Sequence, residues 1–295
     1  MPAAVSIVIV NWNTQALLRQ CLRSLPWDSP DLTLDVIVVD NGSTDGSPEM
    51  VAREFPRVRL VRNDDNLGFV KANNQGLAAA TGDFLFMLNS DTEVRAGAIE
   101  RLVAVAAGDA TIGAVGPTTL NSDGTRQGSF GPFPRLISRF VPHVLEARYS
   151  RARLQAAAAA PDGTVAVDWL AGSALLCSRR VLDTVGPLDE RFFMWYDDLD
   201  WCRRVAAHGL RCVLVTPATI VHHGRQSGQQ LEDARLQEQL LTSEYLYLRL
   251  HHGRAHMRLA MLLRLLKALL SLALRRSPDA NRRKVAFHWR ALREP

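Results

Sequence analysis

FLFMLNSDTE, residues 84–93, is the stretch on which the fold of this chain depends. Its first five residues are apolar, a run long enough for a strand buried on both faces and short for a helix. The small oxygen-bearing residues Asn89, Ser90 and Asp91 then predict a turn at the carboxyl end of that strand. Open α/β sheets bind ligands at this end, where Asn89 and Asp91 could hold a hard divalent cation against a diphosphate. The alternative is a structural strand end followed by a helix that Thr92 caps.

Strands and helices alternate around this stretch. Apolar, β-branched runs predict the strands, and apolar residues at helical spacing follow each of the first three. This alternation predicts an α/β doubly wound sheet with parallel strands and right-handed crossovers. The first strand–helix junction, residues 11–14 (NWNT), lacks the G-x-G-x-x-G fingerprint, which disfavours an NAD or FAD enzyme. The predicted strands are residues 5–10, 36–39, 58–61 and 84–88.

The rest of the domain shows a weaker pattern. Residues 121–163 are punctuated by Gly, Pro and Arg and contain an alanine-rich run, so we expect a mobile excursion that covers an active site. The other predicted elements are a helix over 99–107, a strand over 112–115 ending at Gly116-Pro117, a strand over 210–215 and a further short strand ending near His222.

Three carboxylates within four positions mark a second candidate site at residues 197–200, DDLD. Like charges packed this closely raise one another's pKa and cost stability unless a cation or a reaction uses them. The alternative is a helix N-terminus, which tolerates acids, with Asp200 paired to Arg203 or Arg204. Adjacent histidines, His222 and His223, follow late in the domain. A lone histidine is usually structural, but for a pair near two carboxylate clusters a functional site and a structural role are equally favoured.

Charge is unevenly distributed along the 295 residues. An apolar content of 47% is that of an ordinary globular protein with an ample core, and the net charge is +5. Residues 254–295 carry eleven Lys/Arg and two Asp/Glu, so this tail has a charge of +9 and residues 1–253 carry −4. Tail and body are therefore expected to meet different partners.

The four cysteines are scattered without C-x-x-C spacing, which disfavours a zinc site and a disulfide framework and favours reduced thiols in a cytosolic setting. Residues 1–4 lead directly into a strand pattern, so no secretory signal is expected. No uninterrupted run of about 18 apolar residues is present, so a simple membrane span is not expected.

Residues 257–274 predict an amphipathic helix with one leucine-rich side and one basic side. Such a helix is typical of segments that lie on an anionic membrane surface. The alternative is a helix packed on the domain or on a second copy of the chain. Nucleic acid is disfavoured as a partner because no recognition motif is present. The apolar side comprises Leu262, Leu265, Leu266, Leu269, Leu270 and Ala273, and the other side Arg258, Arg264, Lys267, Ser271 and Arg275.

Eight motifs, in this order, resemble the inverting family 2 glycosyltransferases of the GT-A fold. The resemblance covers residues 5 to 253, and within the family it is nearest to the bacterial rhamnosyltransferase-like branch. The motifs are residues 5–13 (VSIVIVNWN), 38–47 (VVDNGSTDGS), 66–69 (NLGF), 73–76 (NNQG), 88–91 (LNSD), 169–172 (WLAG), 193–204 (FMWYDDLDWCRR) and 222–224 (HHG).

The resemblance implies a role for each motif. Asp40 would accept a hydrogen bond from the uracil or thymine of a nucleotide-sugar donor, and Asn11, Asn13, Asn66 and Asn73 would belong to the same nucleotide-binding group. Asp91 would bind Mg²⁺ or Mn²⁺ on the sugar diphosphate. Asn89 stands where the family often has an aspartate, which removes one charge.

The remaining motifs would supply the other half of the site. His222 or His223 would complete the metal shell, and Asp198, the second acid of its pair, matches the general base of the family. The sugar or acceptor pocket would contain Asn89, Trp169, Gly172, Trp195, Tyr196 and Asp197. Its aromatic rings would stack on sugar faces, and buried aromatic packing is the equal alternative.

Together these features predict a GT-A glycosyltransferase domain over residues 1–228 and a helical, basic amphipathic segment over 229–295. We expect metal-dependent, inverting transfer of a sugar from dTDP-rhamnose or a UDP-sugar to a hydroxyl of a glycan or polyprenyl-linked acceptor in bacterial cell-surface polysaccharide synthesis. The tail would hold the enzyme on the cytoplasmic face of the cell membrane, and a homodimer is the alternative use of the tail.

Two other functions stay open. A sugar-nucleotide nucleotidyltransferase also uses a carboxylate-bound metal on an α/β sheet, but it would show a Gly-rich, basic phosphate loop after the first strand, and residues 11–14 are not one. A catalytically silent nucleotide-binding scaffold would not need Asp91 and Asp198 together.

Overall fold

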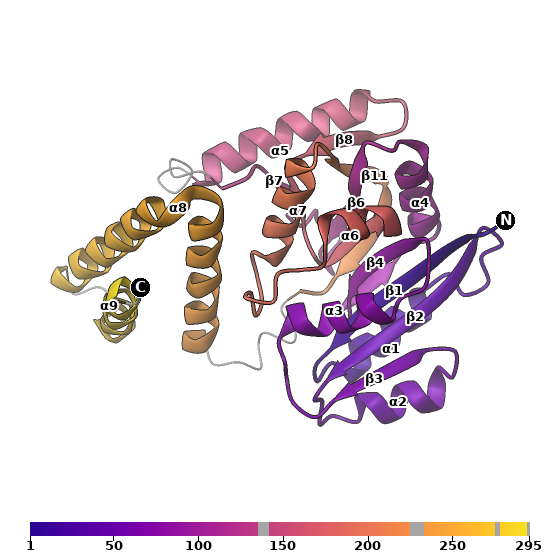
Figure 1. The fold of residues 1–295 in the computed structure, drawn as a ribbon, viewed down its shortest axis with the longest axis horizontal. Coiled ribbons are helices and arrows are strands. Elements are labelled where there is room, and N and C mark those ends of the chain that lie inside the picture. The colour runs from indigo at the N-terminus through magenta and orange to yellow at the C-terminus, as the bar shows by residue number, and fades with distance from the viewer. Residues whose placement is uncertain (135–141, 225–232, 275–277, 294–295) are drawn as a thin grey trace.

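The computed structural model describes residues 1–134, 142–224, 233–274 and 278–293 (Figure 1). Figure 1 shows a twisted central sheet with helices on both faces and a helical tail that projects to one side. The strands are β1 (Ala3–Asn11), β2 (Leu32–Asn41), β3 (Arg59–Asn63), β4 (Phe84–Asn89), β5 (Thr92–Val94), β6 (Ile112–Leu120), β7 (Phe130–Gly131), β8 (Thr164–Val167), β9 (Trp169–Leu170), β10 (Ala174–Ser178) and β11 (Arg211–His222).

The helices complete the described chain. They are α1 (Gln15–Ser24), α2 (Ser47–Glu54), α3 (Phe69–Ala79), α4 (Ala98–Gly108), α5 (Pro142–Ala159), α6 (Arg179–Val185), α7 (Asp197–Ala207), α8 (Asp233–Ala273) and α9 (Pro278–Arg293).

The predicted parallel half of the sheet is confirmed. Its order is β3-β2-β1-β4, and every neighbouring pair is parallel. Both faces of β4 are buried, because Phe86 and Leu88 pack into one core cluster and Leu85 and Met87 into the other. The register sets Asn11 opposite Asp40 and Val10 opposite Asn89, so the polar ends of three strands meet at one edge.

The other half of the sheet mixes directions. β10 lies antiparallel between β4 and β6, and β11 pairs in parallel with β6 and antiparallel with β5 and β8. The predicted strand end at Gly116-Pro117 is wrong, since β6 continues to Leu120. The two strands expected over residues 210–223 are one strand, β11, whose register against β6 shifts between Val215 and Thr219. This irregularity accommodates the prolines of both strands, which have no N–H for the ladder.

The short strand β5 replaces the helix start expected as the alternative at Thr92. β5 pairs with the end of β11, with His222 opposite Thr92, and the next helix begins only at Ala98. The Thr92 hydroxyl donates to the Asn89 carbonyl oxygen at 2.7 Å instead of capping a helix. This pairing brings the two candidate metal-binding motifs together.

Residues 121–163 are more regular than expected, because they contain β7 and the 18-residue helix α5. α5 is fastened to the sheet where the Tyr149 hydroxyl donates to an Asp168 carboxylate oxygen at 3.0 Å. Residues 135–141 of the predicted excursion lie outside the described residues.

Two layers of helices cover the sheet. α1, α2 and α4 bury apolar side chains such as Leu22, Met50 and Leu102 on one face. α3, α6 and α7 cover the other face, and that cluster also takes in Tyr247 of α8. The predicted domain boundary at residues 228/229 lies outside the described residues and stays a prediction.

Gly253, at a φ of 84°, divides α8 into a proximal segment (residues 233–252) and a distal segment (residues 254–273). The proximal segment packs on the sheet domain, and the distal segment folds back with α9 (Figure 1). No helix in the described part of the chain is long and apolar enough to cross a membrane.

The single apolar side predicted for residues 257–274 is only partly correct. Met261, Leu265 and Ala268 are buried in the tail, whereas Leu262, Leu266, Leu269 and Leu270 are exposed. Two apolar faces therefore run along one helix. One face is packed inside the protein, as the alternative expected, and the other is exposed.

Candidate active site

The carboxyl ends of β1 and β2 are joined by a buried polar network. The Asn11 side-chain amide donates to an Asp40 carboxylate oxygen at 3.0 Å and to the Ser43 hydroxyl at 3.1 Å. The other Asp40 oxygen accepts the Ser43 backbone N–H at 2.9 Å. Because each carboxylate oxygen has two acceptor sites, Asp40 keeps capacity to accept a further N–H. Asn11 and Asp40 therefore lie in direct contact at this edge of the sheet, and their role in nucleotide binding stays a prediction.

Asn13 connects the same two junctions from the exposed side. Its backbone takes the left-handed region, with a φ of 52°, which asparagine tolerates better than most residues. Its Oδ1 accepts the Thr44 N–H at 2.7 Å. The side chain therefore braces the loop after β2 beside the predicted nucleotide pocket.

Asn66 and Asn73 are engaged with the protein itself. Asn66 Oδ1 accepts the Asn41 side-chain N–H at 2.8 Å and the Gly68 N–H at 3.0 Å, which holds the loop before α3. The buried Asn73 amide donates to the Phe69 carbonyl oxygen of its own helix at 2.9 Å. Among the described residues, neither side chain forms a hydrogen bond with Asp40. Asn41, which lies in the same motif as Asp40, was missed as the residue that ties this loop to the sheet.

The NSD turn after β4 meets the end of β11. His222 Nε2 lies 3.2 Å from an Asp91 carboxylate oxygen and 3.3 Å from the Asn89 side-chain nitrogen. His222 Nδ1 lies 2.7 Å from Gln127 Oε1, which is an acceptor, so the ring proton is assigned to Nδ1. Nε2 then presents a lone pair toward Asp91. Two acceptors this close favour a cation between them.

His223 is turned away from this pair. Its Nε2 lies 2.9 Å from a Glu93 carboxylate oxygen and its Nδ1 lies 2.8 Å from the Ser122 hydroxyl. Its backbone N–H donates to the Asp91 carbonyl oxygen at 2.9 Å. Of the two predicted histidines, His222 is the one whose side chain contacts the Asp91 carboxylate.

The residues at this corner suit a divalent cation that a diphosphate also holds. Among the described residues, no three His, Cys, Asp or Glu side chains converge as a complete metal site. Asp91 and His222 supply an oxygen and a nitrogen donor, and Asn89 Oδ1 is buried with no hydrogen-bond partner among the residues that the structure describes. Carboxylate, amide and imidazole donors together suit Mn²⁺. The orphaned amide oxygen indicates that the Asn in place of Asp still offers a ligand atom.

The acid pair begins α7, beside the tight turn at Gly172. Asp198 accepts the Gly172 N–H at 3.0 Å and the Leu199 N–H at 2.8 Å. Burial raises the pKa of Asp198, and burial together with the neighbouring Asp198 charge raises the pKa of Asp197 further. The apolar walls responsible are Phe69, Met87, Leu175, Leu188 and Trp201. A carboxylate with a raised pKa is a better proton acceptor.

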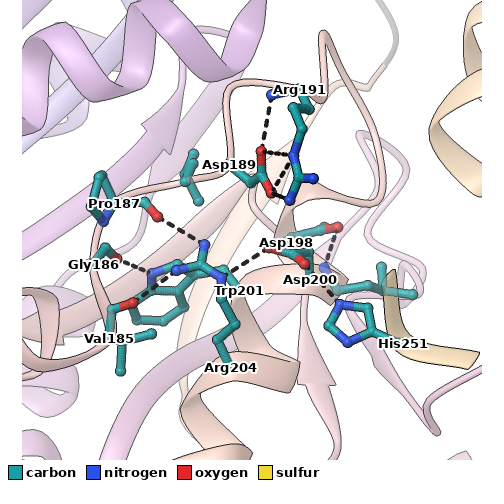
Figure 2. Close-up of polar contacts among 12 residues, drawn as sticks. Val185, Gly186, Pro187, Asp189, Arg191, Asp198, Asp200, Trp201, Arg204 and His251 are labelled. Carbon is teal, nitrogen blue, oxygen red and sulfur yellow. Dashed lines mark hydrogen bonds and ion pairs between the residues drawn. The ribbon is translucent and has the colours of Figure 1, made fainter. Parts of the chain in front are cut away.

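Asp200, the third acid, is structural. It sits between Arg204, whose Nε lies 2.9 Å from one carboxylate oxygen, and His251 of α8, whose Nε2 lies 2.7 Å from the other (Figure 2). The predicted pairing with Arg204 is confirmed. His251 was missed, because nothing in the sequence links a residue of the tail to α7.

The aromatic residues of the predicted sugar pocket have protein partners. Trp169 donates its indole N–H to the Pro132 carbonyl oxygen at 3.0 Å. Trp195 and Tyr196 both have a φ of 63°, a left-handed backbone that costs on the order of 1–3 kcal/mol at each bulky residue. The Tyr196 ring packs on Tyr247 with centroids 5.5 Å apart. Strain directly before the acid pair indicates a backbone held in place for function.

With this geometry in place, the comparisons with known proteins are decisive for the family. A model of glycosyl transferase family 2 matches residues 6–163, more than half of the 295-residue chain. The chain belongs to glycosyl transferase family 2. The N-acetylglucosaminyl-diphospho-decaprenol L-rhamnosyltransferase of Mycobacterium tuberculosis is 30% identical over 247 residues, which are 77% of this chain and 78% of the relative. The family model and this relative together confirm the predicted resemblance, including its nearness to the rhamnosyltransferase-like branch.

Solved structures confirm the GT-A fold. The mannosyltransferase PcManGT from Pyrobaculum calidifontis, solved with GDP-Man and Mn²⁺, has a TM-score of 0.59 and 19% identity, covering 99% of this chain and 88% of its own. GalNAc-T7, solved with UDP, GalNAc and Mn²⁺, has the same TM-score and identity, covering 75% of this chain and 43% of its own. At such identities the likeness establishes the fold alone.

Proposed function

We propose that this glycosyltransferase transfers a sugar, with inversion, from a nucleotide-diphosphate donor to a hydroxyl of a polyprenyl-linked acceptor, with a divalent cation on the donor diphosphate. One observation carries the proposal. Gly172 donates its N–H to Asp198 at 3.0 Å, and the next residue, Ser173, accepts the Asn89 N–H at 3.0 Å. Two consecutive residues therefore join the candidate base to the Asn89–Asp91 corner, which suits attack at a sugar held between them.

The two sides of the site have separate tasks. Asp198 Oδ1 or Oδ2 would accept the acceptor hydroxyl proton as that oxygen attacks the anomeric carbon, and its raised pKa suits this role. Asp91, His222 and Asn89 would hold the cation, which supplies Lewis-acid stabilisation to the departing diphosphate. Asp40 would orient the uracil or thymine ring of the donor by accepting a further N–H through its remaining acceptor capacity. A single displacement with one base inverts the anomeric configuration.

dTDP-rhamnose is the donor we propose first. Support comes from the mycobacterial relative, whose name specifies an L-rhamnosyl transfer to a diphospho-decaprenol-linked sugar and whose match extends over 77% of this chain. A UDP-sugar is the second choice, since Asp40 would accept the same N–H from uracil as from thymine. Both belong to the synthesis of bacterial surface polysaccharide.

Thermal unfolding with a panel of donors tests this function. With Mn²⁺ present, dTDP-rhamnose at 100 times its Kd is expected to stabilise the folded protein by about 2.7 kcal/mol, since it binds only that state. GDP-mannose and Mn²⁺ alone are the controls. The stabilising donor is then incubated with polyprenyl-diphosphate-linked N-acetylglucosamine, and dTDP release is measured. Binding without release for every donor and acceptor would favour the silent scaffold.

We further propose that the tail attaches the enzyme to the cytoplasmic face of the membrane. The distal segment and α9 expose Leu262 at 52%, Leu266 at 54%, Leu270 at 56% and Trp289 at 51%. Exposed Arg258 and Lys267 accompany this leucine face, within a tail of charge +9. Burying a leucine contributes about 1.5–3 kcal/mol, and each cation near an anionic surface about 1 kcal/mol.

Vesicle binding tests the attachment. The double variant Leu266→Asp with Leu270→Asp is expected to lower binding to phosphatidylglycerol vesicles by on the order of 100-fold, because two leucines leave the bilayer. Ala104→Asp with Ala107→Asp, on exposed positions of α4, adds the same charge elsewhere and should leave binding unchanged. Wild-type binding by the leucine variant would contradict the proposal. The wild type could instead fail to bind vesicles while the leucine variant shows half the wild-type mass in light scattering. That result would assign this face to a homodimer.

A further inference from the structure

Three side chains of the proximal segment of α8 touch the chain immediately around the acid pair. The Ser243 hydroxyl donates to the Met194 carbonyl oxygen at 2.7 Å, and the Tyr247 ring packs on Tyr196. His251 Nε2 lies 2.7 Å from an Asp200 carboxylate oxygen (Figure 2). These residues are four positions apart, so they form one stripe along the helix, which we call the α8 stripe. It spans the acid pair, from three residues before Asp197 to two residues after Asp198.

The loop that the α8 stripe holds would not keep its shape unaided. Trp195 and Tyr196 are consecutive left-handed residues, and such backbone persists only where surrounding contacts enforce it. On the opposite side, the Phe193 carbonyl oxygen accepts the Phe69 N–H at 2.9 Å, at the start of α3. The loop is thus held between the start of α3 and α8.

Two members of the stripe are buried and the third, His251, is partly buried, which makes their contacts with the loop specific. Ser243 is 2% exposed and Tyr247 is fully buried. The Tyr247 hydroxyl has no hydrogen-bond partner within the described part of the chain, so the residue acts through its ring. Asp200 is held on its other oxygen by Arg204, which lies on α7 itself, so His251 supplies the contact that reaches α8.

We propose that Ser243, Tyr247 and His251 are positioning residues for catalysis, which fix the strained loop and thereby the direction of the Asp198 carboxylate. The inference rests on the proposed role of Asp198 as base. It assigns to the tail a part in the chemical step as well as in attachment. The partners of the stripe around the acid pair, among the described residues, are Met194, Tyr196 and Asp200, none of which belongs to the predicted nucleotide-binding group, so loss of the stripe should slow turnover without weakening nucleotide binding.

Steady-state kinetics with matched variants test the stripe. Ser243→Ala, Tyr247→Leu and His251→Ala are each expected to lower kcat about tenfold, because small displacements of a catalytic group are costly, while donor KM and nucleotide Kd stay at wild-type values. Tyr247→Phe keeps the ring and His251→Gln keeps a donor near the position of Nε2, so both variants should retain the wild-type kcat. Thr242→Ala removes a neighbouring hydroxyl that donates to the Glu238 carbonyl oxygen of its own helix, and serves as the control.

Hydrogen exchange keeps the inference testable if the larger truncations unfold. Ser243→Ala removes one oxygen, and the amides of residues 195–198 should exchange faster in it than in Thr242→Ala. Wild-type kcat in folded Ser243→Ala and His251→Ala, with unchanged exchange, would overturn the inference. The base assignment fails separately: an active Asp198→Asn would refute the proposed function whatever the exchange shows.

Discussion

Replacing Asp198 with asparagine is expected to lower kcat by about 100- to 10,000-fold, the range that a general base contributes. Asparagine is nearly isosteric and its oxygen can still accept the Gly172 N–H, but its NH2 group cannot accept the Leu199 N–H. Unchanged nucleotide binding is therefore the measurement that assigns the loss to the missing proton acceptor. Binding of the donor nucleotide with Mn²⁺ should be unchanged. Single-turnover rates alongside nucleotide Kd measure the two effects separately.

The pH dependence of kcat gives an independent check on this base. Burial raises the pKa of Asp198, and the base works only when deprotonated, so kcat should rise with pH through that raised pKa. The acid limb should be lost in Asp198→Asn. Asp197→Asn is the matched comparison one residue earlier. A larger loss of kcat in Asp197→Asn than in Asp198→Asn would move the base assignment to Asp197.

Removing either side chain of the Asp91–His222 pair is the second large expected effect. Asp91→Asn and His222→Ala should each weaken Mn²⁺-dependent donor binding and kcat by at least about 100-fold, since even residues that only support a metal ligand reach that range. His222 Nε2 and an Asp91 carboxylate oxygen lie 3.2 Å apart, and Asp91 supplies the negative charge of this pair. Thermal shift with donor, with and without Mn²⁺, measures the loss.

His223→Ala provides the control for this pair. Its ring contacts Glu93 and Ser122, so its removal should leave the Mn²⁺-dependent shift within about twofold of wild type. Equal losses in His222→Ala and His223→Ala would show that both histidines serve the metal. Full Mn²⁺-dependent binding by Asp91→Asn would refute the metal corner.

Most of the parallel sheet and its polar strand ends were predictable, because the signals are local. Residues 84–88 are apolar throughout and residues 5–10 are apolar apart from Ser6, a pattern typical of a strand buried on both faces. The residue after such a run lies at the ligand-binding edge whatever the rest of the chain does. Asp40 and Asp91 could therefore be placed from their position after a strand.

The histidines show what a local pattern leaves open. Successive side chains of a strand point to opposite faces, so at most one of His222 and His223 faces Asp91. Which one does so depends on the register between β5 and β11, which a shift in the long strand β11 alters. A sequence does not record the register of strands that are more than a hundred residues apart.

The tail shows the same division. The period of its leucines predicts a helix, but not that Leu265 is buried while Leu266 is exposed. That choice depends on where the proximal segment and α9 lie. The spacing of Ser243, Tyr247 and His251 was likewise visible in the chain, while their partners on the loop before α7 were not.

The sequence by itself determined the strand–helix alternation, the edge of the sheet that carries the polar residues and the family resemblance, because each depends on neighbouring residues. The tertiary structure decided that His222 meets Asp91 and that α8 supports the loop before Asp198. It also brought Asp198 to the NSD turn, by inserting β10 antiparallel between β4 and β6 so that Gly172 and Ser173 link Asp198 to Asn89. These contacts join residues from 26 positions apart, for Gly172 and Asp198, to 131 positions apart, for Asp91 and His222, and their free energy depends on packing that no local pattern encodes.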